Sequence, residues 1–258
     1  MSETSRMLQI ARVDLSYFFR TKWLLATLIG LNVTDMLVVG IVYGGMTGTF
    51  VYFTFFVPGV IVTGLFFASF DVGRRVHLGL TEGVSQYYLT LPVSLNRLVA
   101  AHLLSAGVGG VIYAGILTVI AAPLMPSLVS VQTLVLIPYM FVLSMGLAGV
   151  AAVMNLFSTA GERYWVITEG VQTTLVALST VAYPISVVQS YLPSFLVSLI
   201  ELNPLSQGAE ALRAVAGSGA GDPSFSLLGL FVTSLVMMGI GVYSYRRVFT
   251  KLREVGKI

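Results

Sequence analysis

Cysteine is absent from this chain of 258 residues. Its absence excludes a disulfide framework and a thiolate-bound metal. Charge is also scarce, because charged residues make up 10% of the chain, whereas soluble domains carry roughly 25%. Apolar residues make up 56%. This composition indicates a protein that lies in a lipid bilayer, and we expect its surplus of basic residues to set its orientation there rather than to bind nucleic acid.

Lysine is nearly absent as well, which bears on nucleotide binding. A phosphate-binding P-loop needs a glycine-lysine pair followed by serine or threonine. The chain has one glycine-lysine pair, Gly256 and Lys257, and Ile258 follows it. We therefore expect no ATP site and no cofactor in this chain.

Titratable residues in the apolar part of the chain are too scattered for catalysis. Asp35, Asp71 and Glu169 are spread along the chain, and His77 and His102 lack the spacing of metal ligands. We expect no catalytic residue and no metal site, and therefore a protein that is not an enzyme.

Six apolar windows are long enough to cross a bilayer, whose core of about 30 Å needs roughly 20 helical residues. They run over Trp23–Tyr43, Val51–Phe70, Leu98–Ala122, Thr133–Phe157, Val166–Val188 and Phe225–Val248. They predict an all-α polytopic membrane protein, in which residues 1–258 form a single transmembrane domain with six spans.

Lysine and arginine are unevenly distributed among the connections between these windows. All except Arg213 precede the first window, separate the second from the third or the fourth from the fifth, or lie at the end of the sixth and beyond. Basic residues gather in cytoplasmic loops of membrane proteins. We therefore expect a multi-pass protein of the cytoplasmic membrane, with both termini and a tail over 249–258 in the cytoplasm.

The N-terminal segment 1–22 has apolar residues at close to helical spacing. These are Met7, Leu8, Ala11, Leu15, Phe18 and Phe19, and most of the charged residues fall on the other side of the helix. The pattern predicts an amphipathic helix along the cytoplasmic membrane surface. A simple basic anchor is an equally good interpretation.

Residues 189–224 form the most unusual segment on the expected outer side. The apolar stretch from Tyr191 to Ile200 is too short to span a bilayer, and Pro193 and Pro204 bound it. A second short helix with Arg213 follows. We expect an external re-entrant helical hairpin between spans five and six.

The connection after the second window reads EGVSQYYLTLPVSLNRLVAAHLL from Glu82. Together with NPLSQGAEALR from Asn203 and with the layout of the spans, it resembles the transmembrane permease subunit of ABC-2 type (type V) ABC exporters. The resemblance covers essentially the full chain, and its loop motif is moderately specific.

In that family, a cytoplasmic loop carries a coupling helix that docks on a separate ATPase subunit. The resemblance assigns this role to the loop 74–97, with contact residues Glu82, Gly83, Tyr87, Tyr88, Leu91, Pro92 and Arg97. It also implies two ATPase subunits, which bind ATP and Mg²⁺, and a second permease subunit, expected to form a homodimer. A plain cytoplasmic loop with tyrosines at the membrane interface is the alternative.

Polar residues inside the expected spans form two groups. Asn32 and Asp35 lie one turn apart in span one, and Glu169, Gln172 and Thr173 share a face of span five. A charged side chain at the bilayer centre costs about 2.5–3.5 kcal/mol on insertion scales, so it normally faces a bundle interior or a wet cavity. These residues either line a transport pathway or join helices by hydrogen bonds.

Gly40 and Gly44 lie four residues apart at the outer end of span one, a spacing that lets helices approach closely. The resemblance implies that spans one and five of two copies meet at the dimer centre. We therefore expect these glycines to pack at the dimer contact.

The expected function is export of a lipophilic, drug-like or lipid-like substrate, in contact with membrane lipids. Export of a lipid-linked polysaccharide is the alternative within the family. Outside it, the alternative is a stand-alone secondary transporter that uses Asp35 and Glu169 for protons.

Overall fold

The computed structural model describes residues 3–46, 51–81, 93–154, 161–218 and 223–254. Throughout these ranges the regular structure is helical, with no strand, so the all-α prediction is confirmed. The helices and helical turns are α1 (Glu3–Arg20), α2 (Lys22–Thr34), η1 (Asp35–Val39), α3 (Gly40–Met46), α4 (Val51–Thr81), α6 (Leu95–Ala121), η2 (Pro126–Leu128), α7 (Val131–Val153), α8 (Gly161–Ala177), α9 (Ile185–Tyr191), α10 (Ser194–Leu202), α11 (Pro204–Val215) and α12 (Pro223–Glu254).

Five helical segments in the described ranges are long and apolar enough to cross a membrane. They are Lys22–Met46, Tyr52–Gly79, Leu95–Ala121, Val131–Val153 and Leu227–Thr250. Each matches one of the six expected windows. The remaining window, Val166–Val188, is not one helix, because α8 ends at Ala177 and α9 begins at Ile185. Pro184 lies at the start of α9 in an extended conformation, which a continuous helix does not allow.

Helix α4 lies at the centre of the molecule. It packs against α6, α7 and α11, and its side chains Phe66 and Phe70 are fully buried. A helix that is apolar on all sides is stable where other helices surround it, which explains its central place. By contrast, the segment formed by α2, η1 and α3 has most of its surface uncovered in the single chain.

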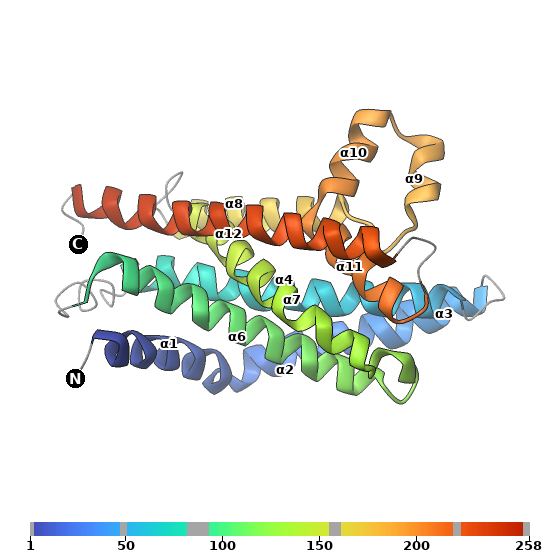
Figure 1. Ribbon diagram of the computed structural model, residues 1–258, viewed down its shortest axis with the longest axis horizontal. Helices are drawn as coiled ribbons and strands as arrows, with labels where there is room; N and C mark the ends of the chain where they lie inside the picture. Colours follow the sequence, from blue (N-terminus) through green and yellow to red (C-terminus); the bar gives the residue numbers. More distant parts are fainter. Residues whose placement is uncertain (1–2, 47–50, 82–92, 155–160, 219–222, 255–258) are drawn as a thin grey trace.

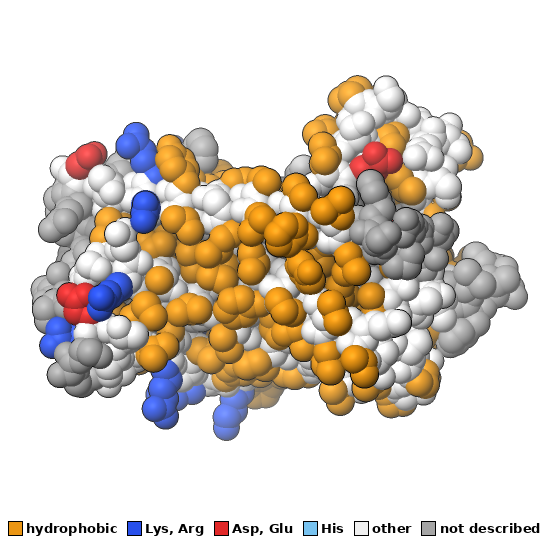
Figure 2. Space-filling model, viewed as in Figure 1, with side chains coloured by type: hydrophobic (Ala, Val, Ile, Leu, Met, Phe, Trp, Pro, Cys, Tyr) orange, Lys and Arg blue, Asp and Glu red, His pale blue; other side chains and the backbone are white. Residues whose placement is uncertain are grey.

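The long helices run along the molecule, and both ends of the chain lie at the same end of it (Figure 1). Hydrophobic side chains cover the middle of the face shown in Figure 2, and lysine and arginine side chains gather toward the end with the termini. The charge asymmetry of the sequence is therefore an asymmetry of the folded molecule.

Several expected boundaries move in the structure. Helix α4 continues to Thr81, so Arg74 and Arg75 are helical and do not belong to the loop predicted over 74–97. Likewise α6 begins at Leu95, which puts Arg97 in its first turn. The expected tail 249–258 begins as the last turns of α12, which ends at Glu254.

The amphipathic helix predicted at the N-terminus is present as α1, but it packs against α6. Ile10, Asp14 and Phe18 are buried there. The sequence put most charged residues of this helix on the side away from its apolar stripe, but Asp14 lies on the packed side. The Asp14 carboxylate lies 2.6 Å from Nδ1 of His102, and this partner on α6 explains its burial.

Helices α7 and α12 approach closely where both carry glycine. A Cβ atom at Gly149 would overlap the backbone of Gly241, and one at Gly146 would overlap the backbone of Met237. Small residues of this kind let two helix backbones pack together without lipid between them. The contact holds α12 against the bundle.

We predict that Gly149→Ala lowers the free energy of unfolding by about 1–3 kcal/mol, because the added methyl group forces the two backbones apart. Gly239→Ala, on the partner helix α12, is the matched control, since a Cβ atom there would meet nothing within 4 Å. Thermal unfolding in detergent measures both variants. Equal midpoints would show that the crossing has room for a methyl group.

Candidate functional site

Several polar contacts between separate segments of the chain meet at Arg213 of α11, which is fully buried. Its Nε donates to the carbonyl oxygen of Phe55 at 2.8 Å, and Nη2 donates to that of Val181 at 2.8 Å. Its Nη1 pairs with Glu210 at 2.7 Å. Its guanidinium also lies 3.6 Å from the centre of the Phe55 ring, a cation–π contact. Arg213 thus joins α11 to α4 and to the segment after α8.

Burial lowers the pKa of Arg213 to about 10, and the neighbouring Glu210 carboxylate acts in the opposite direction. Arg213 therefore stays protonated at neutral pH. Gly59 makes room for this arrangement, because a Cβ atom there would lie 3.1 Å from Nη2 of Arg213 and would overlap the carbonyl oxygen of Val181. The sequence placed Arg213 in the external region but did not indicate that it is buried.

Asn203 closes the end of α8. Its Nδ2 donates to the carbonyl oxygens of Leu175 and Leu178, at 2.7 and 2.5 Å. Its Oδ1 accepts from the backbone N–H of Leu205 and caps α11. The last carbonyls of a helix have no partner within the helix, so a side chain from elsewhere must supply one. Sequence reasoning missed this role, although an asparagine before proline is a recognisable capping signal.

The contacts of Arg213 and Asn203 form a joint where α8 ends. Beyond this joint, α9 and α10 stand out from the bundle (Figure 1). They share a small core of Val188, Val197 and Ile200. Their outer side leaves Tyr191, Phe195 and Leu202 more than half exposed. Pro193 lies in extended conformation between the two helices, and Pro204 opens α11, so both prolines lie at helix starts, a position that proline favours.

The polar residues predicted on span five bond to α4. Arg74 forms an ion pair with Glu169 at 2.6 Å and donates to the side-chain oxygen of Gln172. Its guanidinium also lies 5.3 Å from the ring centre of Trp165. These contacts favour a bracing role for Glu169 and Gln172 within the chain, whereas Thr173 stays exposed. The sequence could not supply the partner, because Arg74 precedes Glu169 by 95 positions.

The polar residues of span one have different surroundings from each other. Asn32 is buried and donates to the hydroxyl oxygen of Tyr113 on α6 at 3.1 Å. Asp35 is exposed and begins the π-helical turn η1. Among the described residues, no side chain bonds to the Asp35 carboxylate. Single π-helical turns inside α-helices often mark functional sites.

The two polar groups are not bonded to each other within one chain, since Asn32 bonds to α6 and Glu169 to α4. Gly40 and Gly44 are buried, and a Cβ atom at Gly40 would lie 2.9 Å from the Phe53 ring of α4. A contact inside the chain thus accounts for the small size of Gly40. The dimer contact stays a prediction.

Three contacts tie α1 to the helices on either side of residues 82–92. Glu3 pairs with Arg97 of α6 at 2.6 Å, and Asp14 contacts His102 of α6 at 2.6 Å. Arg75 of α4 donates to the backbone carbonyl oxygen of Asp14. Helix α1 is therefore fastened to the end of α4 and to the start of α6. The predicted contact residues Glu82, Gly83, Tyr87, Tyr88, Leu91 and Pro92 lie outside the described residues.

Comparison with known proteins adds no assignment: none of the protein-family models matches the chain, and no curated protein is similar to it.

We predict that Arg213→Met destabilises the protein by about 3–5 kcal/mol, because it removes the donor to the carbonyl oxygens of Phe55 and Val181 and the partner of Glu210. Arg163→Met is the control, since Arg163 is exposed on α8. Thermal unfolding in detergent compares the two. A midpoint for Arg213→Met equal to that of the control would mean that the carbonyls find other donors.

Proposed function

We propose that this chain is the membrane-spanning subunit of an ATP-driven exporter, which acts as a dimer and is powered by separate ATPase subunits. Several helices of the chain are long and apolar enough to span a membrane, and the sequence resembles ABC-2 permeases in its layout. The observation that carries the proposal is the attachment of α1 to both helices that flank residues 82–92.

That attachment suits a device that transmits force. If an ATPase subunit binds residues 82–92, its closure moves the end of α4 and the start of α6 together. The ion pair of Glu3 with Arg97 and the Asp14–His102 contact pass this motion to α1. Because α2 begins at Lys22, two residues after α1 ends, span one moves as well.

Six crossings fit the path of the chain better than five. Helix α7 returns to the end of the molecule that holds the termini, and α12 starts from the opposite end (Figure 1). The segment α8 to α11 must carry the chain between these ends. Helix α8 has 17 residues, or about 25 Å, slightly less than a bilayer core. The joint made by Arg213 and Asn203 satisfies the backbone where α8 stops.

A second copy would cover the open face of span one. Leu31, Asp35, Val38 and Val42 are exposed on the segment from α2 to α3. A carboxylate that faces lipid costs about 2.5–3.5 kcal/mol on insertion scales, and a wet or protein-lined dimer axis removes that cost. The apolar surroundings of Asp35 favour a lipophilic, drug-like or lipid-like substrate over a free ion.

The proposed orientation can be tested by labelling, since the chain has no cysteine of its own. We predict that Tyr191→Cys, on the exposed outer side of α9, reacts with a membrane-impermeant thiol reagent in intact cells. Glu254→Cys, at the exposed end of α12, should react only after the cells are opened. The reverse pattern would contradict the proposal, because an inverted chain with six crossings, or a chain with five crossings and a cytoplasmic N-terminus, would give it. Labelling of both in intact cells would mean that α12 does not cross the membrane.

We also predict that replacing Tyr87, Tyr88 and Leu91 by alanine weakens binding of the ATPase subunit. Interface anchors of this kind contribute roughly 2 kcal/mol or more each. The measurement is co-purification of the ATPase from a membrane that expresses both genes. The matched control replaces Tyr191, Leu192 and Phe195 on the α9–α10 hairpin, at the far end of the molecule, and should leave co-purification unchanged.

Two results would contradict the proposal, one from this experiment and one from a transport assay. Normal ATPase binding and normal substrate-stimulated hydrolysis in the loop variant would remove the coupling role. Transport by the chain alone, driven by a proton gradient and lost in Asp35→Asn, would establish the secondary transporter instead.

A further inference from the structure

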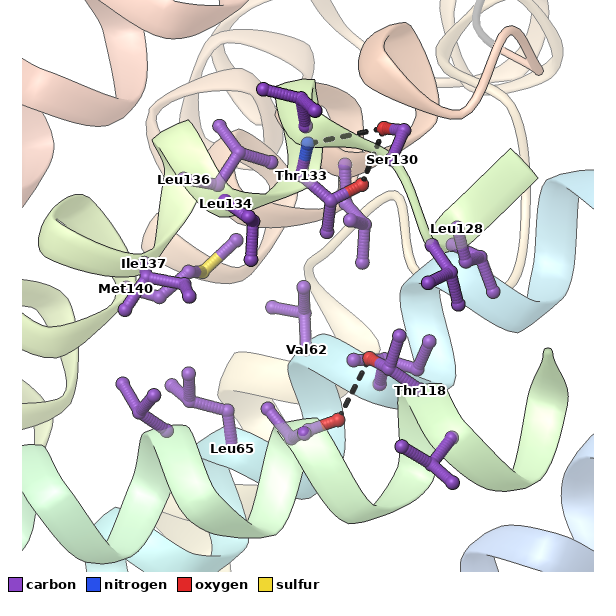
Figure 3. Close-up of a pocket in the computed structure, with 18 residues that line it drawn as sticks. Val62, Leu65, Thr118, Leu128, Ser130, Thr133, Leu134, Leu136, Ile137 and Met140 are labelled. Atoms are coloured by element: carbon purple, nitrogen blue, oxygen red, sulfur yellow. Dashed lines mark hydrogen bonds between the residues drawn. The ribbon is translucent and has the colours of Figure 1, made fainter. Parts of the chain in front are cut away.

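An apolar cavity of about 500 Å³ lies between α4, α6 and α7, apart from the polar groups described above. It is lined by residues of α4 from Ile61 to Leu65, of α6 around Gly115 and of α7 from Val131 to Met140. Figure 3 shows Val62 and Leu65 of α4, Thr118 of α6 and Leu134 of α7 around the space. Pockets for drug-sized ligands have volumes of about 300–1,000 Å³, so the space is large enough for an organic ligand.

The sequence explains why the helices leave this space. Helix α6 has small residues, Ala114 and Gly115, where it faces the cavity. Helix α7 has Pro138 in its interior, and a proline there removes one backbone hydrogen bond and bends the helix. Small side chains of α6 opposite the proline-containing helix α7 leave a gap that no described side chain fills.

The lining indicates an apolar ligand. No charged residue lines the cavity in the described part of the chain. Its hydroxyl groups are bonded locally, since Thr118 donates to the carbonyl oxygen of Ala114 at 2.8 Å and Ser130 accepts from the backbone N–H of Thr133 at 3.2 Å. An apolar cavity does not hold water stably and takes up apolar molecules.

The cavity opens sideways. Val119, Val131 and Leu134 line it and are 61–79% exposed, and all three belong to helices that can span a membrane. In the proposed membrane arrangement, this opening borders the lipid at the outer ends of α6 and α7. We infer that this cavity binds one acyl chain of a membrane phospholipid. The inference rests on the membrane location in the proposed function, but not on export or on an ATPase.

The geometry also orients the lipid. Ser130 and Thr133 lie near the connection between α6 and α7, at the end of the molecule away from the termini (Figures 1 and 3). Residues 122–130 include no charged side chain. The head group therefore lies at this end, in the outer leaflet of the proposed topology, and a neutral or zwitterionic head group suits it.

The experiment uses the full chain in phosphatidylcholine vesicles that contain a small share of phosphatidylcholine with a diazirine on the terminal carbon of one acyl chain. Irradiation followed by peptide mass spectrometry locates the cross-links. We expect label on α4 around Ile61, which is 3% exposed and is reached by lipid through the cavity. Label confined to outward-facing side chains would overturn the inference.

Gly115→Leu supplies the matched test, because a Cβ atom at Gly115 meets nothing within 4 Å and the side chain would enter the cavity. Label at Ile61 should fall about fifteenfold, since the leucine displaces roughly two methylene groups of the ligand and each contributes about fourfold in affinity. Gly239→Leu adds the same side chain at an equally open position on α12 and should leave the label unchanged.

Equal label at Ile61 in both variants would overturn the inference. Loss of the Ile61 label when a second copy of the chain covers the opening would also overturn it. If Gly115→Leu does not insert, Gly115→Val tests the same wall with a smaller side chain, and the position of the label in the unchanged protein still decides the matter. Loss of ATPase co-purification would not alter these results, so the failure of one proposal is distinguishable from failure of the other.

Discussion

Backbone groups that leave a helix in a buried place must find their partners inside the protein, because no water reaches them. The segment after α8 meets this constraint at one joint. Arg213 and Asn203 bond the carbonyls of Val181, Leu175 and Leu178, and they lie on or next to α11. The position of α11 against α4 and α12 depends on that joint. The direction in which the α9–α10 hairpin leaves the bundle depends on it as well.

The same physics explains why a chain with so little charge places its charges in pairs. Arg74 is matched with Glu169, Arg75 with Asp71, and Arg213 with Glu210. A buried charge without a partner costs several kcal/mol, and a pair that also bonds backbone carbonyls recovers much of that cost. The Arg74–Glu169 pair joins α4 to α8, and Arg213 joins α11 to α4 through the carbonyl oxygen of Phe55. The few charges of the chain therefore contribute to its tertiary structure. Asp35 differs, since it is exposed at a π-helical turn of the span with the least cover.

The two proposals concern different parts of the molecule. The helix ends on either side of residues 82–92, together with α1, form the region where an ATPase subunit would act. The lipid-binding cavity lies toward the opposite end, between α6 and α7. An acyl chain there would support the wall between α4 and α7 while α1 and span one move. The cavity and the coupling region share α4 and α6, so both can respond to the same motion.

Composition and hydrophobic length alone determined that the chain is helical and suited to a membrane, because about 20 apolar residues in a row have few other stable environments. The amphipathic period of residues 3–20 likewise predicted α1. Neither could indicate that Asp14 is buried against His102, or that Arg74 bonds to Glu169, because these pairs join residues far apart in the chain. The break after Ala177 was missed for the same reason, since hydropathy counts apolar residues but does not register a carbonyl that bonds to Asn203 or Arg213. The cavity depends on how α7 crosses α6, and only the packed structure decides this.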